Sequence, residues 1–178
     1  MKKIFIFSLL IVTLILVSGL SFAAEAEELE GYMGFDINSR NRGLGFVAGG
    51  RDWLSEWQNI RLGAGSEVEY ISYTEDGKVN NAFGLIAKAN FDITAPINEA
   101  FDYPDLIVDN NWTIKSYLGA GLYFTDVIDG FSPRPGMKLG NNISFPISEI
   151  VDFRTGIGVR YLDDFDSLFI NASLMSRF

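Results

Sequence analysis

The chain has 178 residues, of which 48% are hydrophobic and 21% charged, a composition that fits one ordered domain. Its 14 Lys and Arg against 23 Asp and Glu give a net charge of -9, which argues against nucleic acid as a partner bound through a basic patch. It contains no cysteine and no histidine. Disulfides, thiolate metal sites and every catalytic arrangement built on histidine are therefore excluded.

The first residues have the order of features found in a secretory signal. Two lysines precede an apolar run over residues 4–20, and small residues follow it. Cleavage after Ala23 and cleavage after Ala26 both satisfy the small-residue rule. An uncleaved anchor is the alternative, because about 17 apolar residues reach the lower limit of a spanning helix. We expect residues 1–24 to be an export signal and residues 25–178 to form the folded domain.

The rest of the chain alternates between apolar and polar residues with a period of two, which is typical of strands. In the clearest segment Ile60, Leu62 and Tyr70 share one face, while Arg61 and Glu67 lie on the other. The segments have about ten residues, enough to cross a bilayer when tilted. No stretch shows a sustained helical period, so strands alone are expected. The predicted strands are residues 32–37, 43–51, 60–70, 83–93, 114–124, 136–145, 151–161 and 168–178.

The two faces of these strands differ in size as well as polarity. Glycines concentrate on the polar face, which suits the narrow interior of an eight-stranded barrel that must hold long charged side chains. Large apolar residues fill the other face, and aromatic residues recur near both strand ends, as at the two lipid-water boundaries of a membrane barrel. The predicted fold is therefore an all-β, eight-stranded, antiparallel up-and-down transmembrane barrel. A secreted lipocalin-type binder is the soluble alternative. The predicted belts comprise Trp112, Phe153, Phe91, Phe145 and Phe178 at one level and Tyr70, Phe83, Phe124 and Tyr161 at the other.

An internal repeat predicts the topology. Residues 54–65 match residues 147–158 without a gap, each reading as a turn that feeds a strand. A third copy begins at residues 97–99 and is interrupted by an insertion over residues 101–113. Equivalent turns lie on one side, so both termini are expected on that same side, the periplasmic one. The insertion is a candidate contact for a periplasmic partner or a flap under the barrel mouth, with a longer hairpin stem as the alternative.

The C-terminus carries a family resemblance. Ile170, Ala172, Leu174 and Ser176 alternate toward a final Phe178, which is similar to the assembly signal of bacterial outer-membrane barrels. With its turns and Gly-x-Gly units, the whole domain resembles small OmpA/OmpX-type eight-stranded barrels. The resemblance implies an outer-membrane location, contact with lipid and lipopolysaccharide, and insertion by the barrel-assembly machinery. No peptidoglycan-binding domain is expected to follow the last strand, so wall anchoring by that route is not expected.

Charged residues of both signs fall on the predicted inward face. Buried charges without partners are costly, so we expect a paired network that plugs the lumen. The functional alternative is a narrow path for ions or very small solutes, with the inward glycines leaving room for water. The predicted network comprises Arg61, Glu67, Glu69, Lys88, Asp92, Lys115, Lys138, Asp152, Arg154, Arg160 and Arg177.

An enzyme is not expected. Glu67 and Glu69 lie two residues apart and suit acid-base chemistry by spacing, but the known enzymes among outer-membrane barrels resemble one another in depending on histidine. The acidic residues near the predicted loop tips, Asp126, Asp129, Asp163, Asp164 and Asp166, match no calcium-loop spacing. We therefore expect no metal site and no cofactor. The favoured function is a structural or interaction role with a charge-plugged lumen.

Overall fold

The computed structural model describes residues 29–38, 43–75, 78–101, 111–125, 132–162 and 165–178. The predicted export signal and most of the acidic loop-tip residues lie outside these ranges, as does the greater part of the insertion after residue 101. Within the described ranges, no helix is long and apolar enough to cross a membrane.

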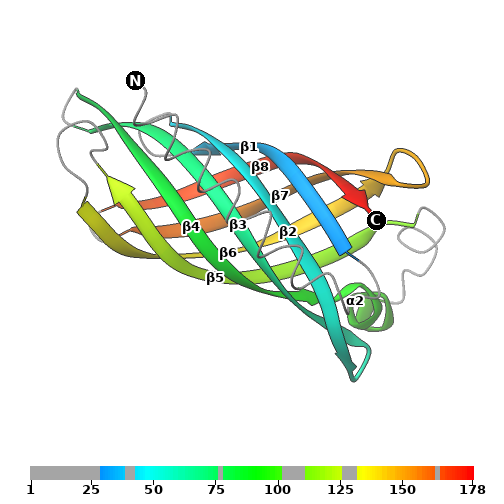
Figure 1. Ribbon diagram of the computed structural model, residues 1–178. Coiled ribbons are helices and arrows are strands. Elements are labelled where there is room, and N and C mark those ends of the chain that lie inside the picture. Colours follow the sequence, from blue (N-terminus) through cyan, green and yellow to red (C-terminus); the bar gives the residue numbers. More distant parts are fainter. Residues whose placement is uncertain (1–28, 39–42, 76–77, 102–110, 126–131, 163–164) are drawn as a thin grey trace.

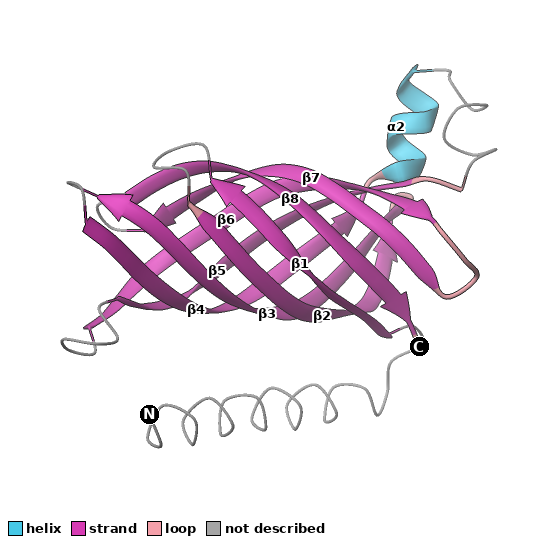
Figure 2. Ribbon diagram, turned by 90° about the horizontal axis from the view of Figure 1, so that it is seen from above, coloured by secondary structure: helices cyan, strands magenta, loops and turns pink. Residues whose placement is uncertain are grey.

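Antiparallel strands close into one barrel, which confirms the predicted eight-stranded up-and-down fold (Figure 1). Each strand pairs with the next along the chain, and β1 pairs with β8 to complete the ring. The strands are strongly inclined to the barrel axis (Figure 2). Their bounds are β1 Leu29–Asn38, β2 Leu44–Trp57, β3 Ile60–Glu75, β4 Lys78–Asp92, β5 Thr113–Thr125, β6 Ser132–Pro146, β7 Val151–Leu162 and β8 Phe165–Arg177.

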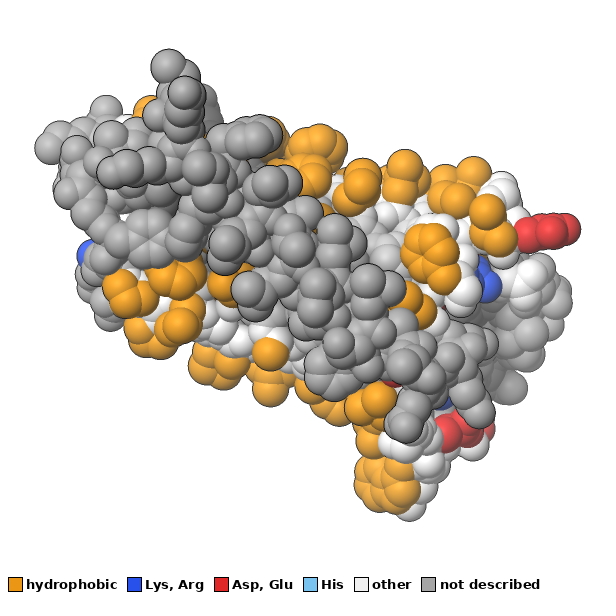
Figure 3. Space-filling model, viewed as in Figure 1, with side chains coloured by type: hydrophobic (Ala, Val, Ile, Leu, Met, Phe, Trp, Pro, Cys, Tyr) orange, Lys and Arg blue, Asp and Glu red, His pale blue; other side chains and the backbone are white. Residues whose placement is uncertain are grey.

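The apolar face of every strand points outward. In β1 the side chains of Met33, Phe35 and Ile37 are 60%, 53% and 57% exposed, whereas Glu30 and Asp36 are at most 3% exposed. In Figure 3 hydrophobic side chains are visible along the barrel on both sides of the grey atoms, and charged side chains are visible toward its ends. A soluble lipocalin-type barrel needs the opposite arrangement, with apolar side chains inside.

One end of the barrel holds both described chain ends, and we call it the terminal end. Here the Phe178 backbone N–H donates to the Leu29 carbonyl at 3.0 Å. The β2–β3 turn, the helix between β4 and β5, and the bend between β6 and β7 lie at this end (Figure 2). The three related connections therefore share one end, as the repeat predicts. We call the opposite end the far end.

A helix, α2 (Thr94–Phe101), connects β4 to the rest of the insertion, so the prediction of strands alone is wrong there. The Asp92 carboxylate caps it by accepting hydrogen bonds from the Thr94 N–H at 3.1 Å and the Thr94 hydroxyl at 2.5 Å. Pro96 lies in the first turn, where its missing N–H has no helical partner to lose. With 8 residues, the helix is too short to show a sustained period.

The first copy of the repeat is also only partly a turn. Strand β2 continues to Trp57 through an irregularity between Trp53 and Ser55, and only Gln58 and Asn59 turn the chain. Both have left-handed backbone angles, with φ of 48° and 62°, which is the requirement of a two-residue hairpin turn. The predicted turn over residues 54–59 is therefore wrong for residues 54–57.

Candidate functional site

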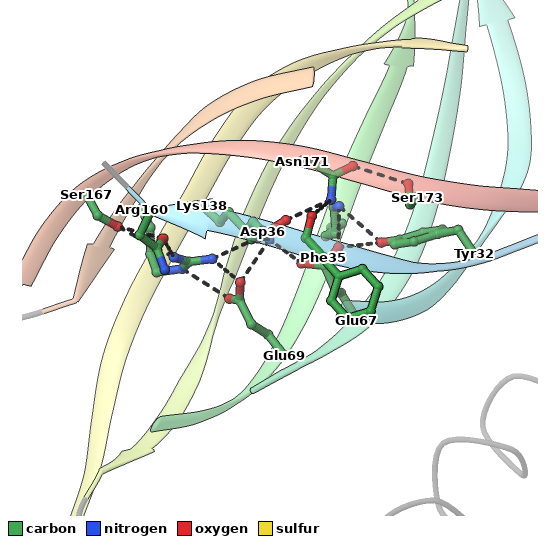
Figure 4. Close-up of polar contacts among 12 residues, drawn as sticks. Tyr32, Phe35, Asp36, Glu67, Glu69, Lys138, Arg160, Ser167, Asn171 and Ser173 are labelled. Carbon is green, nitrogen blue, oxygen red and sulfur yellow. Dashed lines mark hydrogen bonds and ion pairs between the residues drawn. The ribbon is translucent and has the colours of Figure 1, made fainter. Parts of the chain in front are cut away.

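The lumen is crossed by a buried ionic cluster centred on Lys138 of β6. Its ammonium group donates to Asp36 at 2.8 Å, to Glu67 at 2.7 Å and to Glu69 at 3.1 Å (Figure 4). Its side chain is 2% exposed and those of the three carboxylates are between 0% and 2% exposed. One cation therefore holds three carboxylates that come from β1 and β3.

Arg160 of β7 supplies the second cation of the cluster. Its guanidinium contacts Glu69 through two nitrogens and Asp36 through Nη2 at 2.9 Å. Nη1 donates to the Asn38 amide oxygen at 2.6 Å. A planar guanidinium with several donors suits this task, because it can serve several acceptors in fixed directions.

Tyrosine hydroxyls and Lys88 complete the cluster. Tyr32 donates to Glu67 at 2.6 Å, and Lys88 donates to the same oxygen at 2.9 Å. Tyr123 donates to Glu69 at 2.8 Å. All four oxygens of Glu67 and Glu69 therefore accept hydrogen bonds. Because both carboxylates are buried and occupied, their geometry serves the network rather than a substrate.

A separate ionic group lies nearer the terminal end. Glu30 pairs with Arg51, with Lys115 at 3.1 Å, and with the Trp53 indole N–H at 3.2 Å. The Arg51 and Lys115 cations lie 5.1 Å and 5.2 Å from the centre of the Trp53 ring. The indole thus contributes both a donor to the carboxylate and a face to the cations.

Aromatic rings occupy the space beside the lumen glycines. A Cβ built at Gly84 would lie 2.7 Å from the Tyr123 ring, and one built at Gly136 would lie 2.5 Å from it. Likewise a Cβ at Gly140 would lie 2.7 Å from the Tyr117 hydroxyl. These three glycines therefore accommodate aromatic side chains.

An apolar cluster lies in the far half of the lumen. Its members are all at most 8% exposed, and they extend from the middle of the barrel toward the far end. This cluster follows directly on the ionic one, because Tyr123 belongs to both. The cluster comprises Ile71, Tyr73, Ala82, Ile86, Tyr123 and Leu162.

The structure divides the predicted network into three places. Glu67, Glu69, Lys88, Lys138 and Arg160 meet in the central cluster, and Arg154 adjoins it through Tyr32, whose ring lies 3.7 Å from its guanidinium carbon. Lys115 belongs to the Glu30 group. The remaining predicted members, Asp152, Arg177, Arg61 and Asp92, lie at the terminal end, where Asp152 pairs with the half-exposed Arg177 at 2.5 Å.

Sequence reasoning missed several members of the network. Glu30, Asp36 and Arg51 are buried and paired. The Asn38 amide oxygen accepts from Arg160, and the Asn171 amide nitrogen donates to Asp36. The signal was present in β1, where polar residues alternate with Met33, Phe35 and Ile37. Asp36 and Arg51 lie within the predicted strands 32–37 and 43–51, whereas Glu30 and Asn38 lie just outside the first of them.

An open pocket of about 320 Å³ lies at the terminal end, between α2 and the β2–β3 turn. A hydrogen bond of 2.9 Å from the Asn59 side chain to Glu99 ties the turn to the helix, and Thr94 accepts from the Ile114 N–H at 2.8 Å. The pocket is therefore held by contacts on two sides. Its lining residues are Glu56, Asn59, Arg61, Asp92, Thr94, Ala95 and Asn98.

The outward aromatic residues form two groups. Tyr70, Phe83 and Phe124 are direct cross-strand neighbours on β3, β4 and β5 in the far half. Trp112 packs edge-on against Phe145, with ring centres 4.8 Å apart, and Phe145 stacks on Phe153 at 6.4 Å in the terminal half. Phe91 lies opposite Leu62, and Tyr161 opposite Met137.

The predicted assembly signal lies on the outer wall of β8. Ile170 and Leu174 are 54% and 52% exposed, and Phe178 just beyond the strand is 81% exposed. Ala172 points the same way, opposite Phe35 of β1. The last strand thus presents an apolar stripe from Leu168 to Leu174, which Ser176 separates from Phe178.

A scan of protein-family models and a search of curated protein sequences found no match for this chain. Solved structures do match. A major outer membrane protein from Thermus thermophilus aligns with 85% of this chain and 99% of its own length, at 11% identity and a TM-score of 0.57. The Yersinia pestis outer membrane protein Ail aligns with 85% of this chain and 99% of its own, at 13% identity and a TM-score of 0.48. The likeness to the Thermus protein, at 11% identity, shows the barrel fold.

Proposed function

We propose that this chain is an integral barrel of a bacterial outer membrane, closed to ions, with a structural or interaction role. The outward apolar wall supports membrane insertion, since charged side chains are costly on a lipid-facing wall. The strands have between 10 and 16 residues, against the roughly 9–11 needed to cross the hydrocarbon core when tilted.

The observation that carries the closed state is the continuous filling of the lumen. The Glu30 group, the Lys138 cluster and the apolar cluster follow one another from the terminal end to the far half. Opening a path would require separating buried ion pairs, which leaves their charges unpaired in an interior of low dielectric.

The proposal extends to orientation and assembly. Both termini lie in the periplasm, the outer wall contacts lipid and lipopolysaccharide, and the barrel-assembly machinery binds the apolar stripe of β8. The exposure of Ile170, Leu174 and Phe178 supports this last point.

Planar-bilayer recording of the refolded chain tests the closed lumen. We expect no discrete current steps from the wild type, with insertion verified by a heat-sensitive shift on a denaturing gel. The double variant Tyr123→Ala, Phe169→Ala removes two rings that are 0% and 1% exposed and is expected to conduct. Tyr161→Ala, on the outer wall, serves as the matched control and is expected to stay silent. Current steps from the wild type that change when Lys88 or Arg154 is replaced would instead establish the narrow channel.

A periplasmic contact at the terminal end is a second candidate, favoured by the pocket between α2 and the β2–β3 turn. A photo-crosslinking residue at the exposed position Ala95 is expected to give one discrete adduct in cells. The control places the photo-crosslinking residue at Val79, which is 68% exposed near the far end, and it is expected to give no adduct. The absence of an adduct at Ala95, or the same adduct at both positions, would remove this candidate.

A further inference from the structure

Positive charge is in excess inside the lumen, although the chain as a whole carries -9. The buried inward-facing carboxylates are Glu30, Asp36, Glu67 and Glu69. The buried inward-facing bases are Arg51, Lys88, Lys115, Lys138, Arg154 and Arg160. Asp152 is also buried, but Arg177 already neutralises it. Among the described residues, the buried bases of the lumen therefore outnumber the buried carboxylates by two, and uncompensated charge is costly in an interior of low dielectric.

The excess is concentrated at Arg154. This side chain donates from Nε to the Ser173 hydroxyl at 2.9 Å and stacks on Tyr32. Among the described residues, no carboxylate lies within ion-pair distance of it, although the residue is only 2% exposed. Its guanidinium therefore has neutral partners only.

The surroundings of Arg154 add to the positive potential. Lys88 and Arg154 both lie over the Tyr32 ring, with their charged groups 5.3 Å and 3.7 Å from its centre, and like charges this close repel. Arg51 directs Nη2 at the Met175 sulfur at 3.0 Å, and a thioether is a weak acceptor. The guanidinium groups of Arg51 and Arg154 thus lie in one part of the lumen, where Glu30 pairs with Arg51 and Arg154 has no carboxylate partner among the described residues.

We propose that the lumen binds a small inorganic anion of the halide class beside Arg154, between Ser173 and Arg51. An anion there neutralises charge that the carboxylates leave uncompensated and accepts hydrogen bonds from guanidinium nitrogens. This inference deepens the proposed function, because the anion becomes part of the filling that closes the lumen.

The test compares unfolding of the refolded chain in sodium chloride and in sodium gluconate at equal ionic strength. A ligand that binds only the folded state lowers the unfolding equilibrium constant, by roughly tenfold once its concentration is about ten times its dissociation constant. We expect the wild type to unfold at a higher urea concentration in chloride. Ser173→Asp places a carboxylate beside Arg154 and is expected to abolish the difference between the salts. Ser173→Asn introduces a side chain of the same size as aspartate but without its charge, and this variant is expected to retain the difference between the salts.

Equal midpoints in the two salts for the wild type would overturn the site, and so would a chloride effect that survives Ser173→Asp. A crystal grown with bromide gives a direct readout, an anomalous peak beside Arg154, and a peak only elsewhere would also overturn the site. Bilayer recording separates this proposal from the closed lumen. A conducting wild type whose chloride effect is lost in Ser173→Asp would keep the anion site and remove the closed state.

Discussion

Replacing Lys138 by methionine is expected to lower the free energy of unfolding by about 3–5 kcal/mol, the cost of removing one partner from a buried ion pair. The ammonium group contacts Asp36, Glu67 and Glu69, all of them fully enclosed. Methionine fills similar space but leaves these carboxylates with one cation fewer. Urea unfolding of the refolded chain in detergent micelles, followed by tryptophan fluorescence, measures the effect.

Lys88→Met is the matched control for this prediction. Lys88 has one carboxylate partner, Glu67, which retains Lys138 and Tyr32 when Lys88 is lost. Lys88→Met is expected to lower the free energy of unfolding clearly less than Lys138→Met does. Adding Glu67→Gln to Lys138→Met removes one of the uncompensated charges and is expected to recover part of the loss. Equal costs for the two lysines would show that Lys138 is not the centre of the cluster.

Replacing Gly136 by valine is expected to destabilise the barrel by at least the upper end of the roughly 1–3 kcal/mol that overpacking costs. A Cβ at this position would lie 2.5 Å from the ring of Tyr123. The ring cannot move away freely, because Gly84 of β4 borders its other side and its hydroxyl donates to Glu69 at 2.8 Å. The same urea unfolding experiment measures the change.

Two further variants check the cause of that loss. Adding Tyr123→Ala to Gly136→Val makes room for the new side chain. The double variant is therefore expected to lose less free energy of unfolding than the two single variants lose together. Gly31→Val adds the same side chain on the outer wall, where the nearest atom is a ring carbon of Phe178 at 3.3 Å. This control is expected to unfold like the wild type. A similar loss at Gly31 would assign the effect to strand glycines in general.

The alternation of residue types was sufficient to predict the barrel. In a strand, neighbouring side chains point to opposite faces, so Met33, Phe35 and Ile37 share a face whatever the strand pairs with. A shift of one residue in register exchanges the two faces, which is why the pattern specifies pairing so strongly. The inward orientation of Lys138 and Arg160 followed from the same rule.

Local departures from alternation were harder to read. Helix α2 rests on a cap from Asp92 and on contacts with its neighbours, and 8 residues do not establish a period. The extension of β2 to Trp57 depends on the left-handed backbone of Gln58 and Asn59. The match with residues 147–150 indicated a longer turn at this place.

By itself, the sequence determined the number of strands, their inward and outward faces and the sharing of one end by three connections, because these depend on spacing within single segments. The tertiary structure decided which charges meet. Asp36 and Lys138 are 102 positions apart in the chain, and Arg160 and Asn38 are 122 apart. Such contacts depend on the tilt and stagger of strands around the closed barrel and on side chains reaching across it. The cation without a carboxylate, Arg154, became apparent only once every other partner had been placed.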